Sequence, residues 1–122
     1  MTVLLLTLAG AAGAGTRFVL DSLVRPKVPT PLPLSTMAIN VGGSLLLGVL
    51  AGAVLAARVP AEWQTILGTG FLGGYTTFST ASVETIRLIQ SRRGGLAVVY
   101  SLGTLVLSLA AAATGVGLGR LL

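Results

Sequence analysis

The sequence has no cysteine, no histidine and few charged residues, and each absence excludes a class of protein. Without cysteine there is no disulfide framework and no thiolate nucleophile or metal ligand. Without histidine the commonest general base and the commonest zinc ligand are missing. Charged residues make up only 9% of the chain, against about 25% in a typical soluble domain, so they cannot cover a water-exposed surface. A soluble monomer is therefore excluded as the default interpretation.

What the chain has instead is an excess of apolar residues. Of its 122 residues 53% are hydrophobic, and the mean hydropathy is +0.94. Intrinsic disorder needs the opposite composition, with low hydrophobicity and high charge density. The net charge of +5 comes from eight basic residues scattered through an apolar chain, and these do not form the basic groove of a nucleic-acid-binding protein. The composition predicts a membrane protein that binds no nucleic acid.

Long runs without a charged residue predict four transmembrane helices. A helix that crosses the hydrocarbon core needs about 20 residues, and three uncharged runs are that long: Val28–Ala57, Trp63–Val83 and Gly94–Gly119. The first run is shorter but continues past Arg17 into further apolar residues. No polar stretch is long enough for a second domain. We therefore expect one all-α membrane domain over residues 1–122, with spans at about 2–23, 34–57, 63–90 and 95–120.

The basic residues predict an orientation in the membrane. The side with the first and third connections carries Arg25, Lys27, Arg87, Arg92 and Arg93, and the other side carries Arg58 and Arg120. By the positive-inside rule the first and third connections are expected in the cytoplasm and both termini outside. The first span is expected to remain a helix and not to be cleaved as a signal peptide, because no Lys or Arg precedes Arg17.

Most of the 17 glycines lie within the predicted spans, where small residues let helices approach closely. Three pairs have the small-xxx-small spacing, namely Gly48/Gly52, Gly70/Gly74 and Gly115/Gly119. We interpret these pairs as helix-packing surfaces.

Residues 73–77, with the sequence GGYTT, are a different case, because two glycines followed by two β-branched threonines make a poor helix interior. They lie in the middle of the third uncharged run. A helix break at that depth frees backbone carbonyls that protein, water or an ion must satisfy, and broken helices are a recurrent way to build ion sites. The alternative is an intact helix whose threonine side chains bond back to the preceding turn.

A few uncharged polar residues lie within the spans. Asn40 can donate two hydrogen bonds to an anion, or it can link two helices. Tyr100, Thr104 and Ser108 recur every four residues, which places three hydroxyls in one stripe along the last helix. Such a stripe is either a hydrated track or a set of packed polar groups.

Charged residues within or near the spans do not form an enzyme active site. Arg17 either has a function, as ionisable residues in membrane segments commonly do, or extends to the membrane surface. Asp21 is one helical turn further on, so the two side chains can pair. The other acidic residues, Glu62 and Glu84, are too dispersed for a paired-carboxylate site, and we expect no enzyme activity.

Three motifs together resemble one known family. Residues 70–80, GFLGGYTTFST, resemble the third-helix signature of the Fluc (CrcB) family of fluoride ion channels. Residues 10–18, with the pattern GxxGxxxRF, and residues 40–44, with the pattern NxxGS, resemble its first- and second-helix motifs. The size and the four predicted spans also match, so the resemblance covers nearly the whole chain.

The resemblance implies a channel that passively exports fluoride across the bacterial plasma membrane. Family members are antiparallel dimers with two pores and a central structural sodium ion. The carbonyls of Gly73 and Thr76 would hold the sodium, and Arg17 would lie near the aqueous vestibule. The fluoride pathway would be lined by Asn40, Phe78, Ser79, Thr80, Tyr100, Thr104 and Ser108. Amide and hydroxyl donors can replace the water of this small anion without a fixed positive charge that would trap it.

One residue departs from the family pattern. Where the pattern has a second phenylalanine after Thr80, this chain has Ala81. Some family members pair two different chains of fixed orientation, and both Ala81 and the charge bias suit such a heterodimer. Two other functions stay open as alternatives. One is a small four-helix multidrug exporter, which would need a membrane-embedded carboxylate, and the other is a non-conducting membrane assembly subunit.

Overall fold

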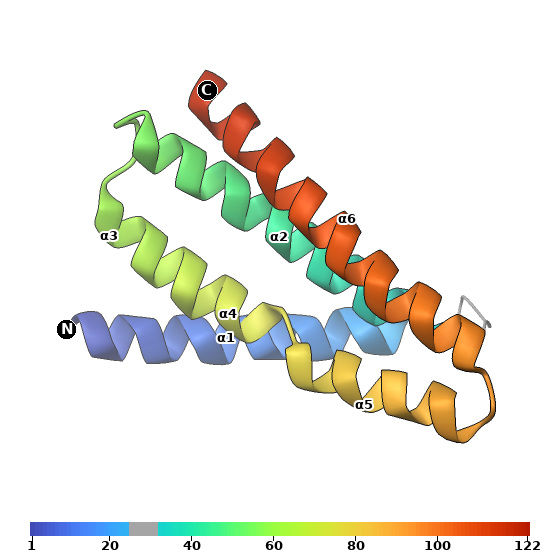
Figure 1. Ribbon diagram of the computed structural model, residues 1–122. Helices are drawn as coiled ribbons and strands as arrows, with labels where there is room; N and C mark the ends of the chain where they lie inside the picture. Colours follow the sequence, from blue (N-terminus) through green and yellow to red (C-terminus); the bar gives the residue numbers. More distant parts are fainter. Residues whose placement is uncertain (25–31) are drawn as a thin grey trace.

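The computed structural model describes residues 1–24 and 32–122, with Ser79 described by its backbone alone. Within these residues every regular element is a helix and there is no β-strand, which confirms the predicted all-α class (Figure 1). The elements in chain order are α1 (Thr2–Val24), α2 (Leu34–Leu55), α3 (Ala61–Trp63), the π-helix η2 (Gln64–Leu72), α4 (Gly73–Tyr75), α5 (Phe78–Gln90) and α6 (Gly94–Leu121).

Three of the helices are long and apolar enough to cross a membrane. They are α1, α2 and α6, with 23, 22 and 28 residues. At 1.5 Å per residue even the shortest is about 33 Å long, which matches a hydrocarbon core of about 30 Å. Large apolar side chains such as Leu8 and Val106 are exposed along these helices, as lipid contact requires. Length, composition and exposure together agree with the predicted multi-pass membrane protein.

Helices α2 and α6 run side by side in the same direction, and glycine lets their backbones touch (Figure 1). Gly48 and Gly52 of α2 lie against backbone carbonyls of α6, and Gly115 and Gly119 of α6 lie against backbone carbonyls of α2. A β-carbon at any of the four would overlap a carbonyl oxygen of the other helix. Two of the three small-xxx-small pairs are thus confirmed as packing surfaces, and they pack against each other.

Helix α1 packs against η2 and α4 in the same manner. A β-carbon at Gly13 would overlap the Phe71 carbonyl, and one at Gly74 would overlap the Gly10 carbonyl. At Gly70 it would come within 2.9 Å of the Ala9 β-carbon. The third predicted pair therefore also packs closely, with α1 as its partner.

The stretch between Ala61 and Gln90 consists of short elements and includes two residues outside any helix. α4 has three residues, and then Thr76 (φ −80°, ψ 159°) and Thr77 (φ −149°, ψ 113°) take extended backbone conformations before α5 begins at Phe78. β-branched residues such as threonine favour extended backbone and are poor helix formers. The Thr77 side chain then caps α5 by accepting a hydrogen bond from the Thr80 N–H at 3.1 Å.

The chain ends and the turns separate into two ends of the molecule (Figure 1). The N-terminus, the turn after α2 and the C-terminus lie at one end, and the turn between α5 and α6 lies at the other. Arg92 and Arg93 of that turn are thus distant from Arg58 and Arg120, as the predicted orientation requires. Arg25 and Lys27, which contribute to the same charge bias, lie outside the described residues. The orientation itself stays a prediction.

Candidate functional site

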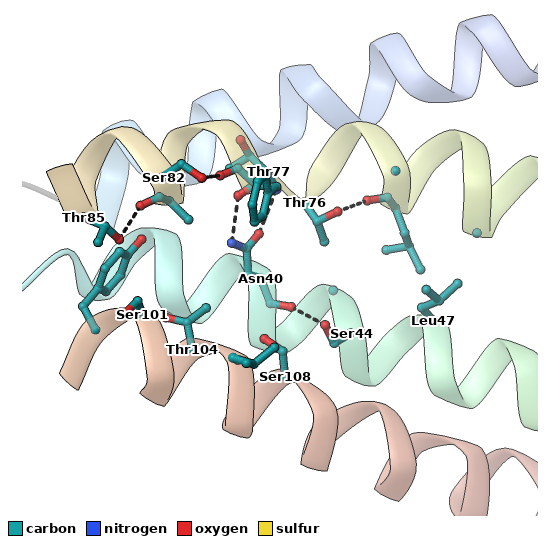
Figure 2. A pocket seen from close by; sticks show the side chains of 18 of the residues that line it. Asn40, Ser44, Leu47, Thr76, Thr77, Ser82, Thr85, Ser101, Thr104 and Ser108 are labelled. Carbon is teal, nitrogen blue, oxygen red and sulfur yellow. Dashed lines mark hydrogen bonds between the residues drawn. The ribbon is translucent and has the colours of Figure 1, made fainter. Parts of the chain in front are cut away.

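A cavity of about 510 Å³ lies beside the two extended residues, between α2, the η2–α4 segment, α5 and α6 (Figure 2). None of the described residues that line it is charged. Its polar lining consists of one amide and of hydroxyl groups, from Asn40, Ser44, Thr69, Thr76, Thr77, Ser82, Thr85, Tyr100, Ser101, Thr104 and Ser108. Such a lining offers hydrogen-bond donors without fixed charge.

Asn40 connects α2 to the backbone at the interruption (Figure 2). Its Oδ1 accepts a hydrogen bond from the Thr77 N–H at 2.8 Å, and its Nδ2 donates to the Thr77 carbonyl at 2.9 Å. Both residues are buried. Because one partner is a donor and the other an acceptor, the orientation of the amide is determined. The helix-linking interpretation of Asn40 is therefore correct, and the second N–H of the amide remains for another acceptor.

The carbonyl groups next to the interruption have unusual surroundings. In a continuous α-helix the Thr77 N–H would donate to the Gly73 carbonyl, but here it donates to Asn40. Among the described residues, no backbone N–H from a turn, loop or cap donates to the Gly73 carbonyl. The Thr76 carbonyl accepts a longer bond, 3.3 Å, from Nη1 of Arg17. Two neutral oxygens suited to a hard cation thus lie on one turn of chain.

Among the described residues, side chains alone do not provide a metal site. The described residues contain no group of three or more His, Cys, Asp or Glu side chains that could hold an ion. A cation here would have to be bound by backbone carbonyls, as the family resemblance implies for Gly73 and Thr76. Two oxygens are fewer than a hard cation takes, since Ca²⁺ takes six to eight, so one chain offers only part of a coordination shell.

Two hydroxyls of α6 are buried in the cavity wall without a partner. The Oγ1 of Thr104 and the Oγ of Ser108 have no hydrogen-bond partner among the described residues. Ser101, on the same helix, instead donates to the Ala97 carbonyl at 2.8 Å, as serines in helices commonly do. A buried polar group without a partner costs about 1–3 kcal/mol, so these two hydroxyls are suited to a ligand or to water.

The two aromatic residues of the cavity, Tyr100 and Phe78, differ in burial. Tyr100 is fully buried and packs with Leu88 and Ala97 in a small cluster between α5 and α6. Ala81, which stands where the family pattern has phenylalanine, is partly buried against this cluster and also lines the cavity. Phe78 lines the cavity too, yet its side chain is 87% exposed.

Not every predicted pathway residue lies at the cavity. Those that line it are Asn40, Phe78, Tyr100, Thr104 and Ser108. The Thr80 side chain is exposed and does not line it, and the Ser79 side chain lies outside the described part of the chain. Arg17 is half-buried and bonds to Thr76, whereas Asp21 accepts a hydrogen bond from Ser35 at 2.6 Å, so the two have different partners.

Sequence reasoning missed one buried polar contact. The hydroxyl of Thr36 on α2 donates to Oε1 of Glu84 on α5 at 2.6 Å, and the two residues are 2% and 7% exposed. The sequence places Glu84 near the end of a span and predicts no role for it. A carboxyl group within the predicted third span was the signal that could have found it.

The fold and the cavity together define a multi-pass helical membrane protein with an uncharged, hydroxyl- and amide-lined cavity beside an interrupted helix. The family model described as "CrcB-like protein, Camphor Resistance (CrcB)" matches residues 4–116. The chain belongs to this family and, with its apolar helices, lies in the cell membrane.

Curated relatives are similar along nearly the whole chain. "Fluoride-specific ion channel FluC 1" of Leifsonia xyli subsp. xyli is 48% identical over 99% of this chain and 88% of the relative. "Fluoride-specific ion channel FluC 2" of Cutibacterium acnes is 43% identical over 98% of both chains. The FluC 2 of Rhodococcus jostii is 44% identical over 94% of this chain and 96% of the relative.

Proposed function

We propose that this chain is a subunit of a fluoride-selective ion channel that lets cytoplasmic fluoride leave the cell passively. The observation that carries the proposal is the pair of buried hydroxyls of Thr104 and Ser108, which have no partner among the described residues, in a cavity whose described lining is uncharged. Its support from relatives is the 48% identity to a protein named as a fluoride-specific ion channel. The members named in this way are channels, and the chain is not an enzyme.

The chemistry of the cavity suits a small, strongly hydrated anion. Hydroxyl hydrogens of Thr104 and Ser108 and the remaining N–H of Asn40 can replace water around fluoride. The positive edge of the Phe78 ring adds a weak electrostatic contribution at the exposed side of the cavity. No fixed positive charge among the described lining residues would hold the ion back.

A second chain completes the proposed channel. The carbonyls of Gly73 and Thr76 would contribute two oxygens from each subunit to a structural sodium ion at the centre of an antiparallel dimer. Their surroundings support this, since Asn40 takes the donor that would otherwise bind Gly73. Neutral carbonyl oxygens are what a weakly polarising cation such as sodium needs when no carboxylate is near.

The second subunit in the proposed dimer is either another copy or a related chain. Ala81 leaves the cavity without one ring of the family pattern, and its β-carbon faces the cluster around Tyr100. With the uneven distribution of basic residues, this supports a heterodimer in which the partner carries the full motif.

Fluoride efflux from liposomes tests the proposal directly. Purified chain reconstituted alone, and together with a family member that has the second phenylalanine, is monitored with a fluoride electrode. With both chains present we expect fast fluoride efflux and no chloride efflux, and from this chain alone we expect little fluoride efflux. Robust flux from this chain alone would contradict the need for a partner, and absence of fluoride flux in both preparations would contradict the channel.

The exporter alternative has one observation in its favour, the buried carboxyl group of Glu84. A proton-coupled exporter needs such a group in the membrane. Imposing a pH gradient across the same liposomes distinguishes the two functions. A passive channel conducts fluoride with no pH gradient, whereas a proton-coupled exporter moves organic cations only when the gradient is present.

A further inference from the structure

The backbone between α4 and α5 is supported by side chains of other helices. Thr76 and Thr77 are extended, and the helix before them, α4, has only three residues. Two side chains reach this backbone from outside, Asn40 from α2 and Arg17 from α1. The two side chains bind different backbone groups of this stretch.

Asn40 holds both backbone groups of a single residue. The two bonds to Thr77 are 2.8 and 2.9 Å long and buried, whereas the Arg17 bond to Thr76 is a single contact of 3.3 Å that is only partly buried. Arg17 is also itself a cation, so it would compete for the Thr76 oxygen and not prepare it for another cation. The shape of the interruption therefore depends mainly on Asn40.

The hydrogen bond that Oδ1 of Asn40 accepts affects the Gly73 carbonyl, one helical turn before Thr77. If the Thr77 N–H were not held by Oδ1, it could return to the Gly73 carbonyl and extend α4 by one hydrogen bond. A carbonyl that already accepts a helical hydrogen bond has less capacity to bind a cation. The Oδ1 atom of Asn40 thus keeps the Gly73 oxygen available, while the Nδ2 atom faces the cavity side with one N–H to spare.

We infer that Asn40 is a positioning residue for the cation site as well as a lining residue of the anion pathway. One side chain then serves two ions of opposite charge. Its oxygen keeps the Gly73 carbonyl open for a small hard cation, and its nitrogen faces the anion. This inference rests on the proposed sodium site. It predicts that the two roles can be separated by changing one half of the amide.

Two substitutions separate the halves. Asn40→Asp keeps an oxygen that accepts from the Thr77 N–H, whereas its ionised carboxylate has no donor and adds a negative charge. Asn40→Leu removes both halves at similar volume. Ser44→Ala is the matched control, since Ser44 lines the same cavity one turn further along α2 and bonds to the Asn40 carbonyl, not to Thr77.

The measurement is the thermal unfolding midpoint of the full-length protein as a dimer in detergent, with the second chain present if fluoride efflux requires it. Sodium chloride is titrated against N-methyl-D-glucamine chloride at constant ionic strength, and fluoride efflux is recorded in parallel. For Asn40→Leu we expect the sodium concentration for half-maximal stabilisation to rise at least about tenfold, with flux lost. For Asn40→Asp we expect the sodium concentration for half-maximal stabilisation to stay within about threefold of wild type, again with flux lost. Ser44→Ala should keep the wild-type sodium response.

The outcomes distinguish the inference from the proposal beneath it. If wild type responds to sodium and Asn40→Leu responds at the same concentration, the positioning role is overturned. If Asn40→Leu does not fold, Asn40→Asp still decides, because loss of its sodium response would contradict the role given to Oδ1. A wild-type protein whose midpoint ignores sodium would instead overturn the proposed cation site.

Discussion

The α2–α6 pair and the interrupted stretch from Gly73 to Phe78 keep their shapes by different means. In the pair, backbone lies on backbone, and four glycines exclude any side chain between the helices. In the interrupted stretch, side chains of α1 and α2 bind backbone groups that have left the helix. Close packing cannot release or accept a ligand without separating two helices. Side-chain bonding leaves the Gly73 carbonyl without its helical donor, and the candidate site lies beside this stretch.

The largest loss of stability is expected where backbone meets backbone. Gly119→Ala places a methyl group on the Val49 carbonyl, and neither helix can yield without separating. We expect a loss of about 3 kcal/mol, measured as the free energy of unfolding in detergent. Gly117→Ala is the matched control, because its β-carbon would meet nothing within 4 Å and alanine favours helix by up to about 1 kcal/mol. Equal losses in both variants would contradict the role of close packing.

The next effect is expected at the buried contact between α2 and α5. Thr36→Val keeps the shape of the side chain but removes the donor to Glu84, and we expect unfolding to become easier by about 2 kcal/mol. Thr36→Ser retains a hydroxyl and should lose less than half of that. The same unfolding experiment measures both. If valine is as stable as threonine, the contact does not stabilise the junction.

A smaller effect is expected for the weaker of the two side chains that bind the interruption. Arg17→Gln removes a single, partly buried contact of 3.3 Å, and its cost should be about 0.5 kcal/mol or less. Asn40→Leu, which removes two short buried bonds, should cost several times more under the same conditions. A larger loss for Arg17→Gln than for Asn40→Leu would mean that Arg17, and not Asn40, is the main support of the interruption.

The smallest effect on stability should accompany a large effect on conduction. Thr104→Ala removes a buried hydroxyl that has no partner among the described residues, so unfolding should change by less than about 0.5 kcal/mol or become harder. Fluoride efflux should fall about tenfold, as expected when one donor in the pathway is lost. Ser101→Ala, which removes a hydroxyl already bonded to Ala97, is the control and should leave efflux closer to wild type. Unchanged efflux in Thr104→Ala would exclude this hydroxyl from the pathway.

Patterns along the chain predicted the helical class, because the limits of apolar runs follow from membrane thickness alone. The small-xxx-small pairs could also be identified from the sequence, because close approach of helices in lipid requires small residues. The two bonds from Asn40 to Thr77 could not be foreseen, because they join residues 37 positions apart and depend on how α2 lies against the interruption. The π-helical bonding of Gln64–Leu72 left no signal in the sequence that we can identify.

In the proposed channel, the hydroxyls of Thr104 and Ser108 have a consequence for the direction of transport. A hydroxyl points its hydrogen at an anion or its lone pairs at a donor with equal ease, and no described residue of the cavity carries a charge that would favour one direction. As a passive pathway it would let the ion move in either direction, down its electrochemical gradient. The driving force would be the electrochemical gradient of fluoride, in which the membrane potential contributes about 2.3 kcal/mol per 100 mV for a monovalent anion. In a cell that is about 100 mV negative inside, internal fluoride at equilibrium would be about fiftyfold below the external concentration. Depolarisation would let the ion flow back in.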